Sequence, residues 1–144
     1  METIKTLLDA RHAGVYWLTS HATPSALEKA AKAAGFAYFH IEGQRLMKKE
    51  QFLNHAALAM HFPDYFGDNW DAFEDCLTDL SWVDNGGYLI VYDHTDVFAE
   101  HSPQHFDTVV EILKESAAFW QTQGKPMLVL LRGKHKVEGL QSVG

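Results

Sequence analysis

The sequence predicts a small α/β fold with a mainly parallel sheet of about four strands and packed helices. Two continuous apolar runs, residues 88–93 and 127–131, are typical of strands buried on both faces, as in parallel sheets. Segments with apolar residues at helical spacing lie between the strand-like runs. Since parallel strands need long crossover connections, this alternation favours helices packed on a sheet.

The first half of the chain predicts a strand, a helix and a second strand. Residues 14–20 are apolar, β-branched and aromatic, which favours a strand. Thr23-Pro24 supplies an N-cap with proline at the first helical position, so we expect a helix over 25–34 that ends at Gly35. Residues 36–42 form the next expected strand.

Two helices are expected before the strand at 88–93. The first ends before Pro63, and its apolar positions are Leu46, Phe52, Leu53, Ala56, Ala57 and Met60. The second carries one apolar stripe, formed by Trp70, Phe73, Leu77 and Leu80.

A last long helix and a final strand complete the expected order β-α-β-α-α-β-α-β. The helix begins at Ser102-Pro103 and ends at Gly124, and the strand follows at 127–131. The polar tail from Arg132 is expected to be frayed. With no linker or repeat in its 144 residues, the chain is expected to form one domain, residues 1–144.

Composition limits the cellular context and the chemistry. The only cysteine, Cys76, excludes an intramolecular disulfide and a cysteine-rich zinc site. The N-terminus lacks the pattern of a secretory signal, and no apolar run approaches the roughly 18 residues of a membrane span. We therefore expect a cytoplasmic protein with no membrane contact.

The net charge of −7 lies in one short segment. Residues 64–84 contain no Lys or Arg, whereas 12 acids and 12 bases balance in the rest of the chain. The segment holds seven acids, Asp64, Asp68, Asp71, Glu74, Asp75, Asp79 and Asp84. Such a surface repels phosphate backbones and attracts basic partners, which disfavours nucleic-acid binding and indicates a cationic partner.

Three of these acids are expected on one helical face. Asp71, Asp75 and Asp79 are spaced i, i+4, i+8 with no cation between them, and each like-charge pair costs about 0.2–0.5 kcal/mol. Because folding gains nothing from this cost, and because the aromatic residues Tyr65 and Phe66 precede the row, the helix is interpreted as a binding surface. A merely solvated acidic face is the alternative.

Catalytic signatures are absent from the sequence, and no cofactor is expected. His101, His105 and Asp107 have spacing that would suit a metal, but a solvated helix start is the favoured interpretation. Cys76 is expected to be a packing residue rather than a nucleophile, because no His or Lys lies at helical spacing to lower its pKa. His40 is expected to be a hydrogen-bonded core or strand-edge histidine.

Residues 62–78 carry a specific motif. They read Phe-Pro-Asp-Tyr-Phe-Gly-Asp-Asn-Trp-Asp-Ala-Phe-Glu-Asp-Cys-Leu-Thr, which resembles the barstar family pattern P-x-Y-[YF]-G-x-N-x-D-A-x-x-D-C-L. The resemblance extends more loosely from residue 38 to residue 131. It implies that residues 1–34 are an added strand and helix relative to the shortest family members.

The resemblance implies an intracellular inhibitor, not an enzyme, that blocks the active site of a basic ribonuclease or related toxin. It implies that Asp75 takes the place of substrate phosphate, that Asp71 is the second key acid, and that Tyr65 and Asn69 are contacts at the mouth of the site. The residues expected to contact the partner are Tyr65, Phe66, Gly67, Asn69, Trp70, Asp71, Glu74, Asp75, Thr78 and Asp79.

The chain also departs from the inhibitor's pattern. Trp70 stands where the inhibitor has leucine, Glu74 where it has tryptophan, and Asp79 where it has glycine, while Phe119 lies near the position of a further contact acid. An alternative is therefore a regulatory protein of the same fold that binds a different cationic protein. The sequence leaves the oligomeric state open.

Overall fold

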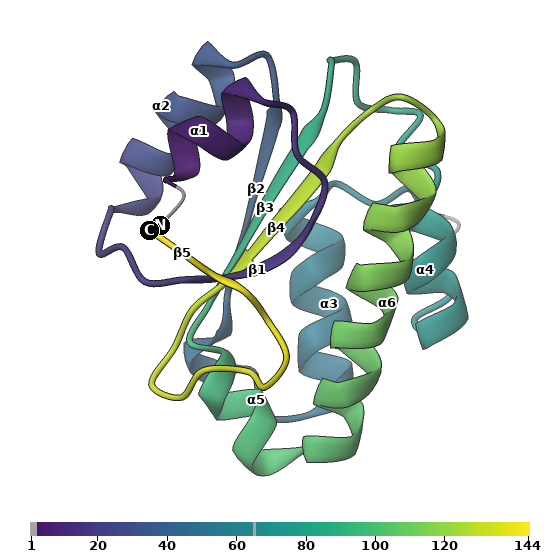
Figure 1. Cartoon of the computed structure of the whole chain (residues 1–144). Helices are drawn as coiled ribbons and strands as arrows, with labels where there is room; N and C mark the ends of the chain where they lie inside the picture. Colours follow the sequence, from purple (N-terminus) through teal and green to yellow (C-terminus); the bar gives the residue numbers. More distant parts are fainter. Residues whose placement is uncertain (1–2, 65) are drawn as a thin grey trace.

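A five-stranded sheet forms the centre of the fold (Figure 1). The computed structural model describes residues 3–64 and 66–144. Its strands are β1 Gly14–Leu18, β2 Ala37–Glu42, β3 Tyr88–Asp93, β4 Met127–Leu131 and β5 Ser142–Val143. They lie in the order β2-β3-β4-β1-β5, and every neighbouring pair is parallel. The predicted α/β class and parallel sheet are confirmed, with one strand more than expected.

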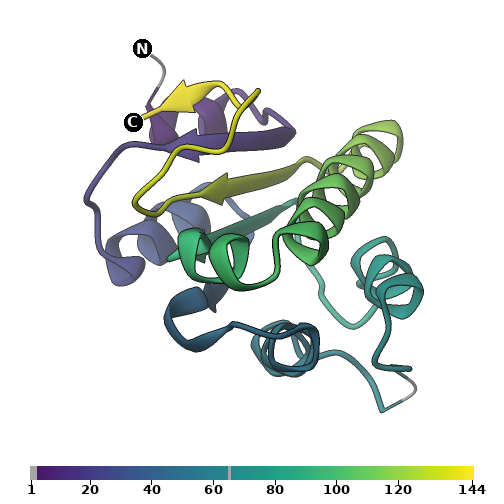
Figure 2. The same ribbon diagram turned by 90° about the horizontal axis from the view of Figure 1, so that it is seen from below.

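Helices cover both faces of this sheet. In the described residues they are α1 Ile4–Asp9, α2 Pro24–Ala33, α3 Lys49–Ala59, α4 Trp70–Leu77, α5 Thr95–His101 and α6 Pro103–Thr122, with a 3-10 turn η1 at Gly43–Arg45. α1 and α2 lie on one face, whereas α3, α4 and α6 lie on the other (Figures 1 and 2). Within the described residues, no helix is long and apolar enough to cross a membrane.

The alternation of side chains along the strands produces two cores. Leu89 and Val91 of β3 face the layer under α1 and α2, while Ile90 and Tyr92 face α3, α4 and α6. The larger core contains a group of stacked and edge-on rings around Phe52. Because the side-chain period is two, Asp93 at the end of β3 continues the row that faces α1 and α2.

Several predicted boundaries agree with the structure. The strands predicted at 88–93 and 127–131 coincide with β3 and β4. Thr23 caps α2 by accepting a hydrogen bond from the Ala26 amide at 3.1 Å, with Pro24 at the first helical position. Gly35 follows α2 with φ +82°, a left-handed conformation that favours glycine.

The prediction of a frayed tail after Arg132 is wrong. Leu140 and Val143 are buried, and β5 pairs with β1 at the sheet edge. The Thr19 amide donates to the Val143 carbonyl at 2.8 Å, which continues this pairing. The tail therefore supplies a fifth strand that covers the outer edge of β1. Helices α1 and α5 were not predicted either.

Candidate functional site

Helix α4 is held in place by its buried side. Phe73, Cys76 and Leu77 are almost completely buried and pack toward the core. The indole Nε1 of Trp120, on α6, donates to the Leu77 carbonyl at 2.7 Å. This bond satisfies one of the carbonyls that have no partner within the last turn of α4. Burial raises the pKa of the Cys76 thiol. The prediction that Cys76 is a packing residue agrees with this burial.

The start of α4 depends on Asn69. Its side-chain oxygen accepts a hydrogen bond from the Ala72 amide at 2.7 Å, and its Nδ2 donates to the Gly67 carbonyl at 3.2 Å. The preceding residue, Asp68, has φ 54°, a left-handed conformation that Asp tolerates better than most residues. Asn69 is exposed, so a contact role and this capping role are compatible.

Asp71 and Asp75 lie one turn apart on the exposed side of α4. Among the described residues, neither carboxylate has an ion-pair partner. Asp71 lies in the first turn, where the helix dipole favours a negative charge, but Asp75 lies beyond that turn. The structure therefore presents two carboxylates on a rigid support and gives Asp75 no evident structural partner.

Asp79 does not continue this row, so the prediction that it lies on the same helical face is wrong. Helix α4 ends at Leu77, and Thr78 is its C-cap, with a hydroxyl that donates to the Glu74 carbonyl at 2.9 Å. Leu80 then turns into the core with φ 47° and is 1% exposed. Burial of Leu80 thus ends the helix before Asp79, which stays exposed at the following turn.

Phe66 and Trp70, which are expected from the sequence to contact the partner, are partly packed against other rings of the protein. Phe66 is half-buried, and its ring centroid lies 5.1 Å from that of Phe62. Trp70 is also half-buried, with its ring tilted against that of Phe52 at a centroid distance of 5.9 Å, and it donates from Nε1 to Nδ1 of His105 at 3.3 Å. Gly67 is exposed, and the predicted contact Tyr65 lies outside the described residues.

Helix α6 contributes a second acidic row that sequence reasoning missed. A groove of about 490 Å³ between α4 and α6 is lined by Trp70, Asp71, Glu74, Asp107, Thr108, Glu111, Ile112 and Glu115. The α6 acids are spaced i, i+4, i+8 and so share one side of the helix. This spacing is visible in the sequence, but the position of these acids beside α4 depends on how the two helices pack.

The two helices meet through a pair of carboxyl groups. A hydrogen bond with Glu115 raises the pKa of Glu74, and partial burial and the charges of Glu115, Asp75 and Asp71 raise it further. The raised pKa reflects the close approach of several carboxyl groups in the groove. Such a concentration of negative charge suits a cationic partner.

The suggested metal set at His101, His105 and Asp107 does not come together. His101 lies at the end of α5, where Nδ1 is 2.9 Å from the Val97 carbonyl, and His105 accepts from Trp70. Ser102 separates α5 from α6, so the two histidines do not share one helix. The favoured interpretation, a polar helix start, fits this arrangement.

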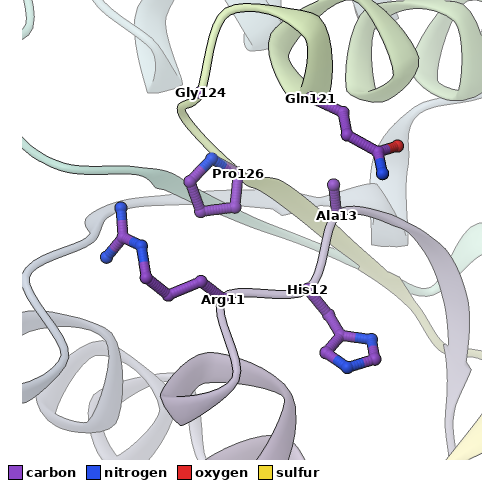
Figure 3. A pocket seen from close by; sticks show the side chains of 6 residues that line it. All are labelled: Arg11, His12, Ala13, Gln121, Gly124 and Pro126. Carbon is purple, nitrogen blue, oxygen red and sulfur yellow. The ribbon is translucent and has the colours of Figure 1, made fainter.

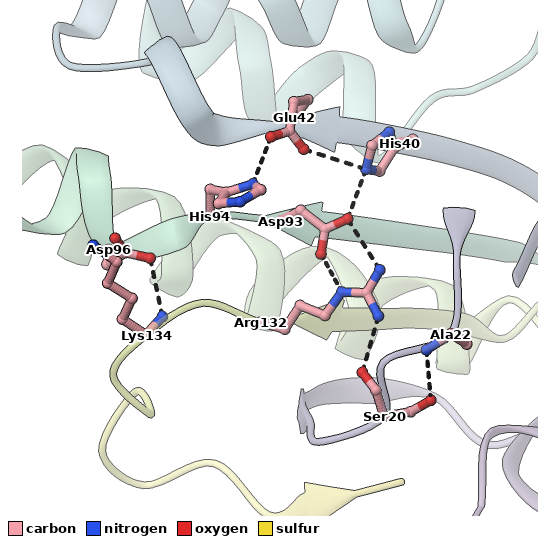
Figure 4. A network of polar contacts seen from close by, with 9 residues as sticks. All are labelled: Ser20, Ala22, His40, Glu42, Asp93, His94, Asp96, Arg132 and Lys134. Carbon is pink, nitrogen blue, oxygen red and sulfur yellow. Dashed lines mark hydrogen bonds and ion pairs between the residues drawn. The ribbon is translucent and has the colours of Figure 1, made fainter. Parts of the chain in front are cut away.

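A second polar cluster lies at the carboxyl ends of the strands (Figure 4). His40 Nε2 lies 2.8 Å from Asp93 Oδ2, as the prediction of a hydrogen-bonded histidine requires. Arg132 donates to both oxygens of Asp93 and, through Nη1, to the Ser20 carbonyl at 3.0 Å. Burial alone raises the pKa of Asp93, but the hydrogen bonds from His40 and Arg132 outweigh it and hold this pKa below its ordinary value.

This cluster was also missed from the sequence. Each of three expected strands ends in or is followed by a charged residue, namely Glu42, Asp93 and Arg132. Because parallel strands bring their carboxyl ends to one edge of the sheet, that pattern was the available signal.

A hollow of about 360 Å³ lies at the opposite edge of the sheet, before β1 and β4 (Figure 3). Arg11 lines this hollow. Its guanidinium donates to the Gly86 carbonyl and lies over the Phe36 ring, 5.6 Å from the ring centroid. Arg11 therefore ties the turn before β3 to the segment after α1, which is a structural task.

The chain was compared with known proteins and protein families. No curated protein matches the chain significantly. Residues 36–132 match the family described as Barstar (barnase inhibitor). The match runs from the start of β2 to the end of β4 and includes the whole of α4 and α6. Because it covers more than half of the chain and contains the acidic helix, the protein belongs to the barstar family.

Proposed function

We propose that the protein inhibits a basic ribonuclease or related toxin by placing α4 in the enzyme's active site. The observation that carries this proposal is a pair of exposed carboxylates, Asp71 and Asp75, on a helix whose other side is buried. Within the described part of the chain, neither carboxylate forms an ion pair. Ribonuclease active sites hold phosphate with Arg, Lys and His, and carboxylates satisfy the same donors. Asp75 takes the phosphate's place and Asp71 binds a neighbouring cation. The expected compartment is the cytoplasm.

The buried side of α4 supports this role energetically. Phe73 and Leu77 fix the helix against the core, and Trp120 ties its last turn to α6. A partner that binds the exposed face therefore meets carboxylates that are already ordered, so little conformational entropy is lost on binding. The acids of α6 that line the groove, Asp107, Glu111 and Glu115, extend the negative surface beyond α4. They raise the rate of encounter with a cationic protein.

The acidic row on α6 is the observation that favours a related alternative, a regulatory protein whose cationic partner is not a ribonuclease. Glu111 and Glu115 widen the acidic surface beyond α4. An elongated basic segment would contact both helices, whereas an active-site cleft would enclose α4. The two possibilities differ in whether binding stops catalysis by the partner.

The test is inhibition of ribonuclease activity. The full chain is titrated into barnase, and into the basic ribonucleases of the native host, with an RNA substrate in excess. We expect stoichiometric inhibition that competes with substrate for at least one of these enzymes, and loss of inhibition in Asp75→Ala and Asp71→Ala.

The matched control is Asp9→Ala. Asp9 is exposed at the end of α1, on the other face of the sheet, and its replacement changes net charge by the same amount. If Asp9→Ala weakens inhibition as much as Asp75→Ala, general charge rather than α4 is responsible. Binding of a ribonuclease without any inhibition would contradict the proposal.

A further inference from the structure

The polar cluster at the carboxyl ends of the strands borders an open crevice. A cavity of about 580 Å³ is lined by residues at or just after the ends of β1, β3 and β4, including Ser20, Asp93, His94 and Arg132, together with Glu42. The chain leaves β1 toward α2 on one face and leaves β3 toward α5 and α6 on the other. Such a reversal at the carboxyl edge of a parallel sheet is where α/β folds bind ligands.

Three potential ligand atoms converge at the side of this crevice (Figure 4): Glu42 and Asp93 line it, and His40 contacts both of them. His40 Nε2 lies 2.8 Å from Asp93 Oδ2 and 3.8 Å from Glu42 Oε2, and one ligand atom from each of the three residues lies within 4.8 Å of the others. Bonds of about 2.0–2.2 Å to a tetrahedral zinc ion separate neighbouring ligand atoms by about 3.4 Å. Small side-chain rotations therefore bring the three atoms to coordination distance.

Each carboxylate is also held from outside the centre. Arg132 donates from Nε to Oδ1 of Asp93 and from Nη2 to Oδ2 at 3.3 Å, and Nδ1 of His94 pairs with Oε1 of Glu42. Both carboxylates are thus held from outside the centre, while Oδ2 and Oε2 face His40. The Glu42 amide donates to His55 Nε2 at 3.0 Å, which fixes the backbone at this end of β2. Outer contacts of this kind orient ligands in known metal sites.

Close backbone packing brings these segments together. A Cβ atom at Gly43 would lie 2.5 Å from the Asp93 carbonyl, and one at Gly133 would lie 2.7 Å from Oδ1 of Asp96. The contact at Gly43 is with backbone, so glycine is needed there for the ends of β2 and β3 to meet. The contact at Gly133 is with the end of the Asp96 side chain, which would have to shift.

We propose that His40, Glu42 and Asp93 form a binding site for a divalent transition-metal ion of the zinc class. One imidazole and two carboxylates form a ligand set that zinc accepts, whereas Mg²⁺ prefers oxygen ligands in octahedral geometry. Three protein ligands leave a fourth position open toward the crevice, where a water or a small anion completes the coordination. The competing explanation is an ion-pair network that only ties the strand ends together.

The site is separate from the surface proposed for partner binding. By the alternation of side chains along β2 and β3, His40, Glu42 and Asp93 lie on the side of the sheet opposite Phe39, Ile41 and Tyr92. That is the side of α1 and α2, whereas α4 lies on the other (Figure 1). The inference therefore does not depend on inhibition of a ribonuclease, and Asp75→Ala is expected to leave metal binding unchanged.

The test is calorimetric titration of the full chain, stripped with chelator, with Zn²⁺ alone and then with Mg²⁺. We expect one equivalent of Zn²⁺ at the crevice, no measurable Mg²⁺ binding, and an affinity for Zn²⁺ at least about tenfold lower in His40→Gln. His101→Gln is the matched control, because it removes an imidazole outside the proposed ligand set. Its affinity for Zn²⁺ should equal that of the parent.

A second variant, Glu42→Gln, keeps the test decisive if His40→Gln does not fold. The side chain of Glu42 is 36% exposed, so Glu42→Gln is expected to fold, which circular dichroism checks, and it should also lose at least about tenfold in affinity. The proposal is overturned if the parent binds no Zn²⁺, or if His40→Gln and His101→Gln bind it equally. Equal binding would assign the zinc to surface histidines and leave the crevice as an ion-pair network.

Discussion

Replacement of Asn69 separates its capping role from a contact role. In Asn69→Ala, the Ala72 amide loses its 2.7 Å acceptor and the Gly67 carbonyl loses its 3.2 Å donor. Loss of an N-cap side chain costs about 0.5–2 kcal/mol, and the hydrogen bond to Gly67 is exposed and adds little. Because α4 has only eight residues, we expect a decrease of about 1–2 kcal/mol in the free energy of unfolding.

Urea denaturation and thermal melts measure this change. A loss of 1 kcal/mol lowers Tm by about 2–4 °C in a protein of this size. Asn69→Ser is the matched variant, since its hydroxyl accepts from the same amide, and we expect it to stay within about 0.5 kcal/mol of the parent. If Asn69→Ser is as unstable as Asn69→Ala, or if Asn69→Ala is as stable as the parent, the cap does not hold α4 in place.

Three further predictions follow from the charges and the sheet. Glu74→Gln should raise Tm at pH 7 but not near pH 4. The pKa of Glu74 is raised in the folded protein, so the ionised carboxyl lowers stability once the pH exceeds 4.5, the ordinary pKa of glutamate, and glutamine removes this loss. Thermal melts between pH 4 and pH 7 check it. Deletion of residues 3–35 should abolish cooperative unfolding, since it uncovers Leu128 and Leu130; a calorimetric scan that still shows a cooperative transition would contradict it. The rate of association with an inhibited ribonuclease, measured by stopped flow, should fall steeply as salt screens the α4 and α6 acids, and a flat rate would exclude them from steering.

The sequence predicted the central strands well because their burial is simple. β3 and β4 are buried along their whole length, so a continuous apolar run marks both ends. Helix α5 was missed because it is short and polar, and only Phe98 is an apolar residue buried deeply in it. β5 has two residues, and its pairing depends on the exposed edge that β1 provides. No local pattern carries that information.

In the candidate site, too, some features follow from local sequence patterns and others depend on tertiary packing. The exposure of Asp71 and Asp75 follows from helical periodicity, which the sequence displays. The end of α4 before Asp79 depends on burial of Leu80, a tertiary effect. The crevice depends on strand order, since His40 meets Asp93 only because β2 lies beside β3 in register.

The central claim is that Asp75 and Asp71 bind the partner's phosphate-binding cations, and calorimetric titration of single variants against an inhibited ribonuclease tests it most directly. We expect Asp75→Ala to weaken binding most, by about 2–5 kcal/mol, Asp71→Ala to follow, and Glu74→Ala to have the smallest effect. The thermal melt of Asp75→Ala should match that of the parent, because this carboxylate has no ion-pair partner among the described residues. If Asp75→Ala binds the ribonuclease as tightly as the parent does, Asp75 does not take the place of the substrate phosphate.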